Sequence, residues 1–126
     1  MSYVKFETPE EVRKMAIELI SVAKDTGKVR KGINEATKSI ERKAAKLVVI
    51  AEDVSPPEIA MHLPGLCEEM GIPYLYVKTK KQLGEAAGLK VGTSSVAVED
   101  PGSGAEILQD IVKRLPKHEA KKKGEK

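Results

Sequence analysis

The sequence predicts one α/β domain whose sheet is covered by helices on both faces, followed by a short basic tail. Segments with helical periodicity alternate with apolar runs of strand length, the pattern that predicts such a sheet. Two of the runs, 46–51 and 72–77, are almost continuously apolar, which is typical of strands buried on both faces. The chain of 126 residues suffices for one ordinary domain, which we place at 1–116, and is too short for two.

The first half of the chain is expected to contain two helices and two strands. Thr8 and Pro9 predict a helix start, because Thr caps helices and Pro suits the first helical position. Gly27 is expected to end the turn after this helix, and Gly32 to precede the next one. The predicted elements are a helix over 8–24, an edge strand over 28–31, a helix over 34–43 and a strand over 46–51.

The second half is expected to contain three helices and two strands. Ser55 with the prolines after it predicts a helix start, and Pro64 inside that helix is expected to kink it. Gly71 and Gly88 are expected to close two helices. The predicted elements are a helix over 55–70, a strand over 72–77, a helix over 79–87, a strand over 94–98 and a helix over 105–115.

Composition excludes several classes of protein. No apolar run approaches the ~20 residues that a membrane helix needs, and the first residues lack the apolar core of a signal peptide, so we expect a soluble cytoplasmic protein. Cys67 is the only cysteine, and with His62 and His118 it forms none of the cysteine-rich zinc sites. Cys67 lies on an apolar helix stripe and Tyr74 and Tyr76 share one strand face, so all three are expected in the core.

Charge is sorted along the chain, although the net charge is only +3. Residues 24–46 carry eight basic and three acidic side chains, a net +5, and residues 78–90 carry a net +3. Residues 52–69 carry five acidic side chains and no basic one, and the tail 117–126 carries a net +3. If the two basic segments meet in space, they form a positive face that attracts polyanions. The acidic segment is then expected to point elsewhere.

Motif spacing argues against common enzyme sites. Gly27 and Gly32 have the spacing of a phosphate-binding P-loop, but Ile33 and Asn34 stand where Lys and Ser or Thr belong. Glu52 and Asp53 follow a predicted strand, where α/β enzymes often place acids, so a metal site there stays a minor alternative. We therefore expect no catalysis and no cofactor.

The segment 31–38 carries the most functional information. A helix N-terminus after Gly32 offers N–H groups and a positive dipole end to a phosphate. Asn34 is expected at the helix N-cap, and Asn34, Lys38 and Arg42 are four residues apart and share one face. Asn and Lys side chains suit base edges, and a carboxylate at Glu35 could accept hydrogen bonds from base amino groups. These residues predict nucleic-acid recognition.

Two alternatives from other classes remain open at this point. One is a small α/β enzyme or phosphate-ligand binding domain that uses the helix N-terminus at Asn34. The other is a protein-interaction module whose basic face docks an acidic partner. A deep pocket would favour the first, and binding without any preference for RNA would favour the second.

Four stretches of the sequence carry a resemblance to a known family. They are Gly32–Lys38 (GINEATK), 51–59 (AEDVSPPEI), 62–69 (HLPGLCEE) and 72–74 (IPY). In this order they resemble the kink-turn RNA-binding ribosomal proteins, over about residues 8–114. Within that family, the sequence is most similar to the archaeal large-subunit member that is also the core protein of box C/D and H/ACA guide ribonucleoproteins.

The resemblance implies both a fold and a function. The fold is a three-layer α-β-α sandwich with a small mixed four-stranded sheet. The function is recognition of a kink-turn, a bulge next to tandem sheared G·A pairs, without catalysis. Implied partners are ribosomal RNA, box C/D and H/ACA guide RNAs, in some archaea ribonuclease P RNA, and other proteins of these particles. We expect a monomer when the protein is free.

The resemblance also implies which residues of the helix side touch RNA. Asn34, Glu35 and Lys38 would contact the guanines of the G·A pairs. The residues implied to lie along the RNA backbone are Lys31, Gly32 and Arg42.

A second group of implied RNA contacts lies later in the chain. Lys80 would reach a phosphate near the bulge, and Leu89, Lys90 and Val91 would form a loop that packs on the protruding nucleotide. Ser55 stands where relatives often have an acid that touches this nucleotide, so a shorter reach is expected there.

Overall fold

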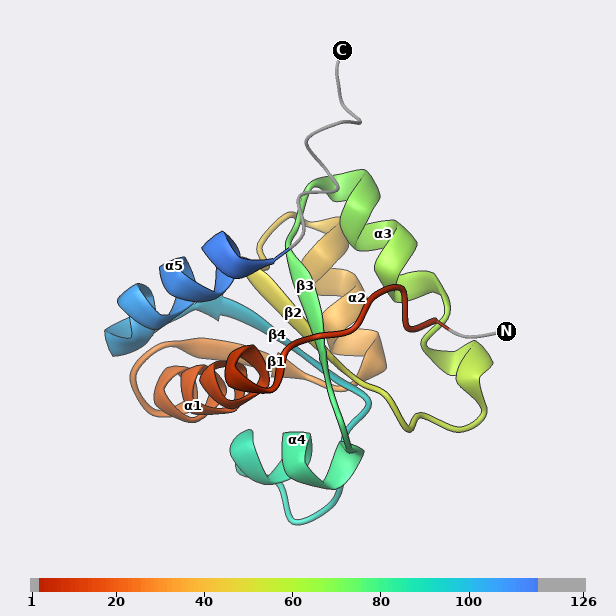
Figure 1. Ribbon diagram of the computed structural model, residues 1–126, viewed down its shortest axis with the longest axis horizontal. Helices are drawn as coiled ribbons and strands as arrows, with labels where there is room; N and C mark the ends of the chain where they lie inside the picture. Colours follow the sequence, from red (N-terminus) through yellow and green to blue (C-terminus); the bar gives the residue numbers. More distant parts are fainter. Residues whose placement is uncertain (1–2, 116–126) are drawn as a thin grey trace.

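The computed structural model describes residues 3–115, which form five helices, four strands and two short 3-10 turns (Figure 1). The predicted basic tail 117–126, with His118, lies outside the described residues. Within the described part, no helix is both long enough and apolar enough to span a bilayer. The elements are α1 (Glu10–Thr26), β1 (Lys28–Lys31), α2 (Ile33–Glu41), β2 (Leu47–Ala51), η1 (Pro57–Ile59), α3 (His62–Met70), β3 (Tyr74–Val77), α4 (Lys80–Ala86), β4 (Ser95–Asp100), η2 (Gly102–Gly104) and α5 (Ala105–Arg114).

The four strands form one mixed sheet in the order β1-β4-β2-β3. The last strand in the chain, β4, lies between β1 and β2 and is antiparallel to both, while β2 and β3 are parallel. Three strands therefore end, and β4 begins, at the same end of the sheet. We call this the α4 end, because α4 follows β3 there (Figure 1).

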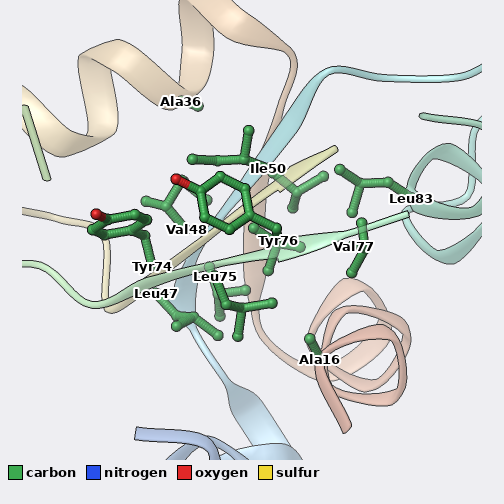
Figure 2. Packing of buried hydrophobic residues seen from close by; sticks show 14 of the residues in the cluster. Ala16, Ala36, Leu47, Val48, Ile50, Tyr74, Leu75, Tyr76, Val77 and Leu83 are labelled. Carbon is green, nitrogen blue, oxygen red and sulfur yellow. The ribbon is translucent and has the colours of Figure 1, made fainter. Parts of the chain in front are cut away.

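Helices cover both faces of the sheet, as the sequence predicts. In Figure 2, Ala36 of α2 lies on one side of the strands and Ala16 of α1 on the other. Helices α2 and α3 pack together on the first side, and α1 packs against both α4 and α5. The side chains of β2 and β3 are buried along their whole length, which explains their continuous apolar sequence. The three-layer sandwich implied by the resemblance is confirmed.

The predicted core residues are buried. Tyr74 and Tyr76 are at most 1% exposed, and their rings pack edge to face with centroids 5.9 Å apart. Cys67 is fully buried, and burial raises the pKa of its thiol to about 12, so the thiol stays protonated at neutral pH. None of these three side chains is available to stack on a base or to act as a nucleophile.

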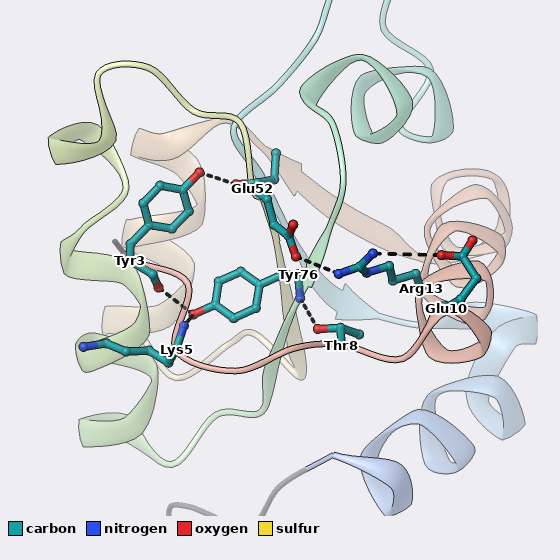
Figure 3. Close-up of polar contacts among 8 residues, drawn as sticks. Tyr3, Lys5, Thr8, Glu10, Arg13, Glu52 and Tyr76 are labelled. Atoms are coloured by element: carbon teal, nitrogen blue, oxygen red, sulfur yellow. Dashed lines mark hydrogen bonds and ion pairs between the residues drawn. The ribbon is translucent and has the colours of Figure 1, made fainter. Parts of the chain in front are cut away.

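The N-terminal segment before α1 is held against β2 and β3 by hydroxyl groups (Figure 3). The Tyr3 hydroxyl donates to the Ala51 carbonyl at 2.6 Å and accepts from the Val54 N–H at 2.9 Å. The Tyr76 hydroxyl donates to the Tyr3 carbonyl at 2.6 Å and accepts from the Lys5 N–H at 2.9 Å. Buried hydroxyls thus satisfy backbone groups that no strand pairs.

The prediction that Thr8 caps α1 is wrong. Helix α1 begins at Glu10 with Pro9 at the N-cap and no side-chain cap. The Thr8 hydroxyl accepts instead from the Tyr76 N–H at 3.1 Å, on the outer side of the edge strand β3. Thr8 is buried at this contact. Its hydroxyl supplies the acceptor that the outward N–H of an edge strand does not find within the sheet.

The single helix predicted over 55–70 is also wrong. The segment contains the 3-10 turn η1 and then α3, which starts at His62, so Ser55 lies before both and caps neither. Pro64 consequently falls in the first turn of α3 and causes no kink, because N–H groups of the first turn have no acceptor within a helix. Gly71 closes α3 as predicted, in the left-handed conformation with φ +72°.

Candidate nucleic-acid interface

The α4 end of the sheet brings four separate segments together. The Gly32 N–H, just before α2, donates to the Ser95 carbonyl at 2.8 Å at the start of β4. The Ala51 N–H at the end of β2 donates to the Ser94 carbonyl at 2.9 Å, and the Glu52 N–H donates to the Val77 carbonyl at 2.9 Å. The start of α2, the turn after β2, the start of α4 and the loop before β4 are therefore neighbours. Both basic segments of the sequence reach this end.

Helix α2 starts at the α4 end, directly after β1, and Gly32 forms the turn between them. This residue is the N-cap and has φ +93°, a conformation that side chains rarely adopt. The sequence predicted Asn34 as the N-cap, and this prediction is wrong: Asn34 is the second residue of the helix. Glu35 is the third, where a carboxylate also stabilises the helix dipole by about 0.3–1 kcal/mol.

The exposed face of α2 carries the residues implied to read bases. Asn34, Glu35 and Lys38 are exposed, while Ala36 and Ile40 are fully buried against the sheet. The helix is thus fixed by its apolar side and presents amide, carboxylate and ammonium groups on the other side. This combination of donors and acceptors suits base edges better than a phosphate alone.

The far end of α2 is anchored by Glu99 of β4. The Ser39 hydroxyl donates to the Glu99 carboxylate at 2.7 Å, and the Arg30 and Arg42 guanidinium groups lie 3.3 Å and 3.8 Å from it. Burial acts to raise the pKa of Glu99, but the Ser39 hydroxyl and Arg30 outweigh it, and the net pKa is lowered. Arg42 is the C-cap of α2, so the structure places it away from the α4 end.

The turn after β2 is held from three sides. The Tyr3 hydroxyl bridges Ala51 and Val54 across it. The Arg13 guanidinium lies 2.8 Å from the Glu52 carboxylate, and the Asp53 carboxylate accepts from the Lys80 N–H at 2.8 Å. Figure 3 shows the contact of Arg13 with Glu52. The turn therefore fixes the position of the first residue of α4.

One sequence expectation about this turn needs correction. Glu52 and Asp53 do not point away from the basic residues: both lie at the α4 end, where Arg13 and the start of α4 compensate their charge. As for the minor alternative of a metal site, residues 3–115 contain no group of three or more His, Cys, Asp and Glu side chains that could hold an ion. The role of Glu52 and Asp53 in the structure is to connect β2 to α1 and α4.

A shallow hollow of about 480 Å³ lies between this turn and the loop before β4. Among the large hydrophobic residues of the described chain, Val91 is the most exposed, at 69%. Leu89, in contrast, is half-buried, and Ser55 is exposed on the segment that follows β2. The residues that line the hollow are Asp53, Lys80, Lys81, Glu85, Lys90, Val91 and Gly92. The hollow thus combines three ammonium groups and two carboxylates with the exposed apolar side chain of Val91.

The structure thus brings most of the expected site residues to one end of the sheet. Lys31 and Gly32 lie at the end of β1, α2 begins at the same end of the sheet, and Lys80, Lys90 and Val91 line the hollow. Arg42 alone lies at the opposite end of its helix. Sequence reasoning missed the positioning role of Asp53, whose carboxylate accepts from the Lys80 N–H at the start of α4. It also missed the close approach of the loop before β4 to Gly84, for which the glycine inside the predicted 79–87 helix was the available signal.

Comparison with known proteins agrees with this geometry. The model of the Ribosomal protein L7Ae/L30e/S12e/Gadd45 family matches residues 15–108. Among solved structures, the chain is similar to the Giardia lamblia 15.5kD RNA binding protein, with 30% sequence identity and a TM-score of 0.84. The match covers 90% of this chain and 94% of that chain. The family resemblance seen in the sequence is confirmed: the chain belongs to the Ribosomal protein L7Ae/L30e/S12e/Gadd45 family.

Proposed function

We propose that this protein binds RNA at the α4 end of its sheet and recognises a kink-turn there. The observation that carries the proposal is the arrangement of the α4 end. The exposed face of α2 with Asn34, Glu35 and Lys38 begins at the same end of the sheet as the loop that exposes Val91. The family match and the RNA-binding protein from Giardia lamblia support RNA as the ligand.

The geometry supports a preference for a bent RNA over a straight one. In an ordinary A-form duplex the major groove is too deep and narrow for a helix to enter. A kink next to sheared G·A pairs opens that groove, so the start of α2 could reach the guanines. At the same time the bend turns out a nucleotide, which the Val91 loop and the hollow beside Lys80 would receive.

The mechanism is a population shift without chemistry. Free kink-turn RNA samples extended and bent forms, and a protein that binds only the bent form increases its population. Bending brings phosphate groups together, and the ammonium groups of Lys31, Lys38, Lys80 and Lys90 reduce their repulsion. In cells, we propose that it binds ribosomal RNA and guide RNAs and nucleates the assembly of ribosomes and of box C/D and H/ACA ribonucleoproteins in the cytoplasm.

One titration tests the proposal against its alternatives. A kink-turn RNA is compared with the same RNA whose G·A pairs are replaced by Watson–Crick pairs, at one stated salt concentration, because phosphate contacts make affinity depend steeply on salt. Tighter binding to the intact kink-turn supports the proposal. Equal affinity for both RNAs reduces the interface to nonspecific electrostatics, and no affinity for either would favour a protein partner or a small ligand.

A further inference from the structure

The loop before β4 is attached to α4 at both of its ends. The Leu89 N–H donates to the Gly84 carbonyl at 2.9 Å, and the Thr93 N–H donates to the Lys80 carbonyl at 3.1 Å. The Lys80 N–H in turn donates to Asp53 at 2.8 Å. The loop, α4 and the turn after β2 are thus linked by hydrogen bonds in one continuous series.

The backbone of this loop also touches the backbone of α4 at Gly84. A Cβ atom at Gly84 would overlap the Val91 carbonyl oxygen and come within 3.0 Å of the Gly92 Cα. From the loop side, a Cβ at Gly92 would lie 3.0 Å from the Lys80 Cβ. Gly84 is buried, and its φ lies outside the left-handed region, so space rather than conformation requires glycine here.

The close contact determines where Val91 stands. Its side chain is 69% exposed, although burying apolar surface would be favourable in free energy. A loop hydrogen-bonded at both ends and packed on Gly84 cannot retract this side chain into the core. The side chain is therefore held over the hollow before any ligand arrives, which lowers the entropy lost on binding.

We propose that Gly84 is a positioning residue: its missing side chain sets the height of Val91 over the hollow and thereby the selectivity for a turned-out nucleotide. This inference rests on the proposed function and adds a determinant of selectivity that does not itself touch the RNA. A methyl group at position 84 pushes the loop outward, so the Val91 side chain and the base of that nucleotide no longer fit together.

The test compares Gly84→Ala with Gly65→Ala. Gly65 lies in α3, and a Cβ there would meet nothing within 4 Å, so this variant controls for a helical Gly→Ala change. Each protein is titrated with an intact kink-turn and with the same RNA that lacks only the base of the turned-out nucleotide. Wild type and Gly65→Ala should prefer the intact RNA by about tenfold, the contribution of one apolar side chain contact. Gly84→Ala should bind both RNAs about equally.

A double-mutant cycle with Val91→Ala separates positioning from general damage. If Gly84 acts through Val91, adding Gly84→Ala to Val91→Ala should leave the preference for the intact RNA unchanged. If Gly84→Ala does not fold, as judged by circular dichroism, Gly92→Ala displaces the loop from its other side and should lose the same preference. A variant that folds and keeps the tenfold preference would overturn the inference.

The two hypotheses fail in different ways. If wild type does not distinguish the kink-turn from its Watson–Crick counterpart, the proposed function fails. If wild type does so while Gly84→Ala still distinguishes the intact RNA from the RNA lacking the base, only the role of Gly84 fails.

Discussion

The two sides of the interface both depend on a glycine, for opposite reasons. At Gly32, before α2, a side chain would meet nothing within 4 Å, but φ is +93°. At Gly84, under the Val91 loop, φ is ordinary for a helix, but a side chain would overlap the loop backbone. At Gly32 the backbone conformation requires glycine, and the space beside the residue is open. At Gly84 the backbone of the loop fills the space beside the residue, so the position of the loop is set before a ligand binds. Glycine thus permits an unusual backbone conformation next to the exposed start of α2, and permits close backbone packing beneath the Val91 loop.

The helix side is expected to supply most of the affinity, which two lysine substitutions compare directly. Lys38→Ala should cost roughly 1–3 kcal/mol of kink-turn binding, because this side chain is expected to contact a guanine. Lys90→Ala on the loop side should cost less and weaken all RNAs alike, as loss of a phosphate contact does. Binding isotherms at fixed salt, with the kink-turn RNA and with its Watson–Crick counterpart, measure the two losses of binding free energy. Lys14→Ala, on the exposed side of α1, is the control. Equal losses for Lys38 and Lys90 would contradict the comparison.

The backbone requirement at Gly32 can be isolated with a second glycine. Gly32→Ala should destabilise the fold by about 1–2 kcal/mol, because a Cβ is strained at this φ, and should also weaken RNA binding. Gly71→Ala is the matched control: φ is +72°, nothing lies within 4 Å, and the residue closes α3. Its ψ of 29° places Gly71 in the left-handed helical region, which side chains tolerate better than the φ and ψ of Gly32. Gly71→Ala should therefore cost somewhat less stability in urea unfolding than Gly32→Ala and leave RNA affinity unchanged. Loss of binding in both variants would mean that stability alone controls affinity.

The loop side should report RNA bending rather than total affinity. Val91→Asp places a carboxylate at the apolar contact and should disfavour the bent RNA by roughly 1 kcal/mol, because a base contact is lost and phosphates repel the new charge. Fluorescence transfer between dyes on the two RNA stems measures the bent fraction. Val112→Asp, at an exposed apolar residue of α5 on another face, should leave the bent fraction unchanged. Unchanged bending with Val91→Asp would count against the loop contact.

The smallest effect is expected at Glu99, where the far end of α2 is anchored. Its pKa is lower in the folded protein than its ordinary value of 4.5, so the charged carboxylate stabilises the fold above that pH. This stabilisation is lost as pH falls from 4.5 through the lowered folded pKa. Glu99→Gln should therefore reduce stability at neutral pH and flatten the acid side of the stability profile in urea unfolding. A profile identical to wild type would show that Ser39 and the arginines do not depend on this charge.

The order of elements was predictable because it follows from local signals. The buried strands Leu47–Ala51 and Tyr74–Val77 are continuous apolar runs, and Gly71 and Gly88 mark helix ends by their left-handed conformation. The exposed face of α2 was predictable from the four-residue spacing of Asn34 and Lys38. Family membership followed from motifs that span most of the chain.

The contacts that the sequence did not predict are mostly hydrogen bonds from a side chain to a segment far away in the chain. Thr8 and Ser55 look like helix caps, yet the Thr8 hydroxyl bonds to β3, and the helix after Ser55 starts only at His62. The Asp53 carboxylate accepts from the N–H of Lys80, 27 residues later, a contact that the sequence did not predict. Such contacts have no local pattern, so sequence spacing could not reveal them.

By itself, the sequence determined the α/β class and the helix that carries Asn34 and Lys38, because each depends on neighbours within a few residues. The loop with Val91 was expected only from the family resemblance. Only the tertiary structure decided that these segments lie together. Strand β4 is the last in the chain but pairs between β1 and β2, and this pairing brings the loop before β4 to the start of α2. Strand order depends on contacts between residues far apart in the chain, as does the packing of that loop on Gly84.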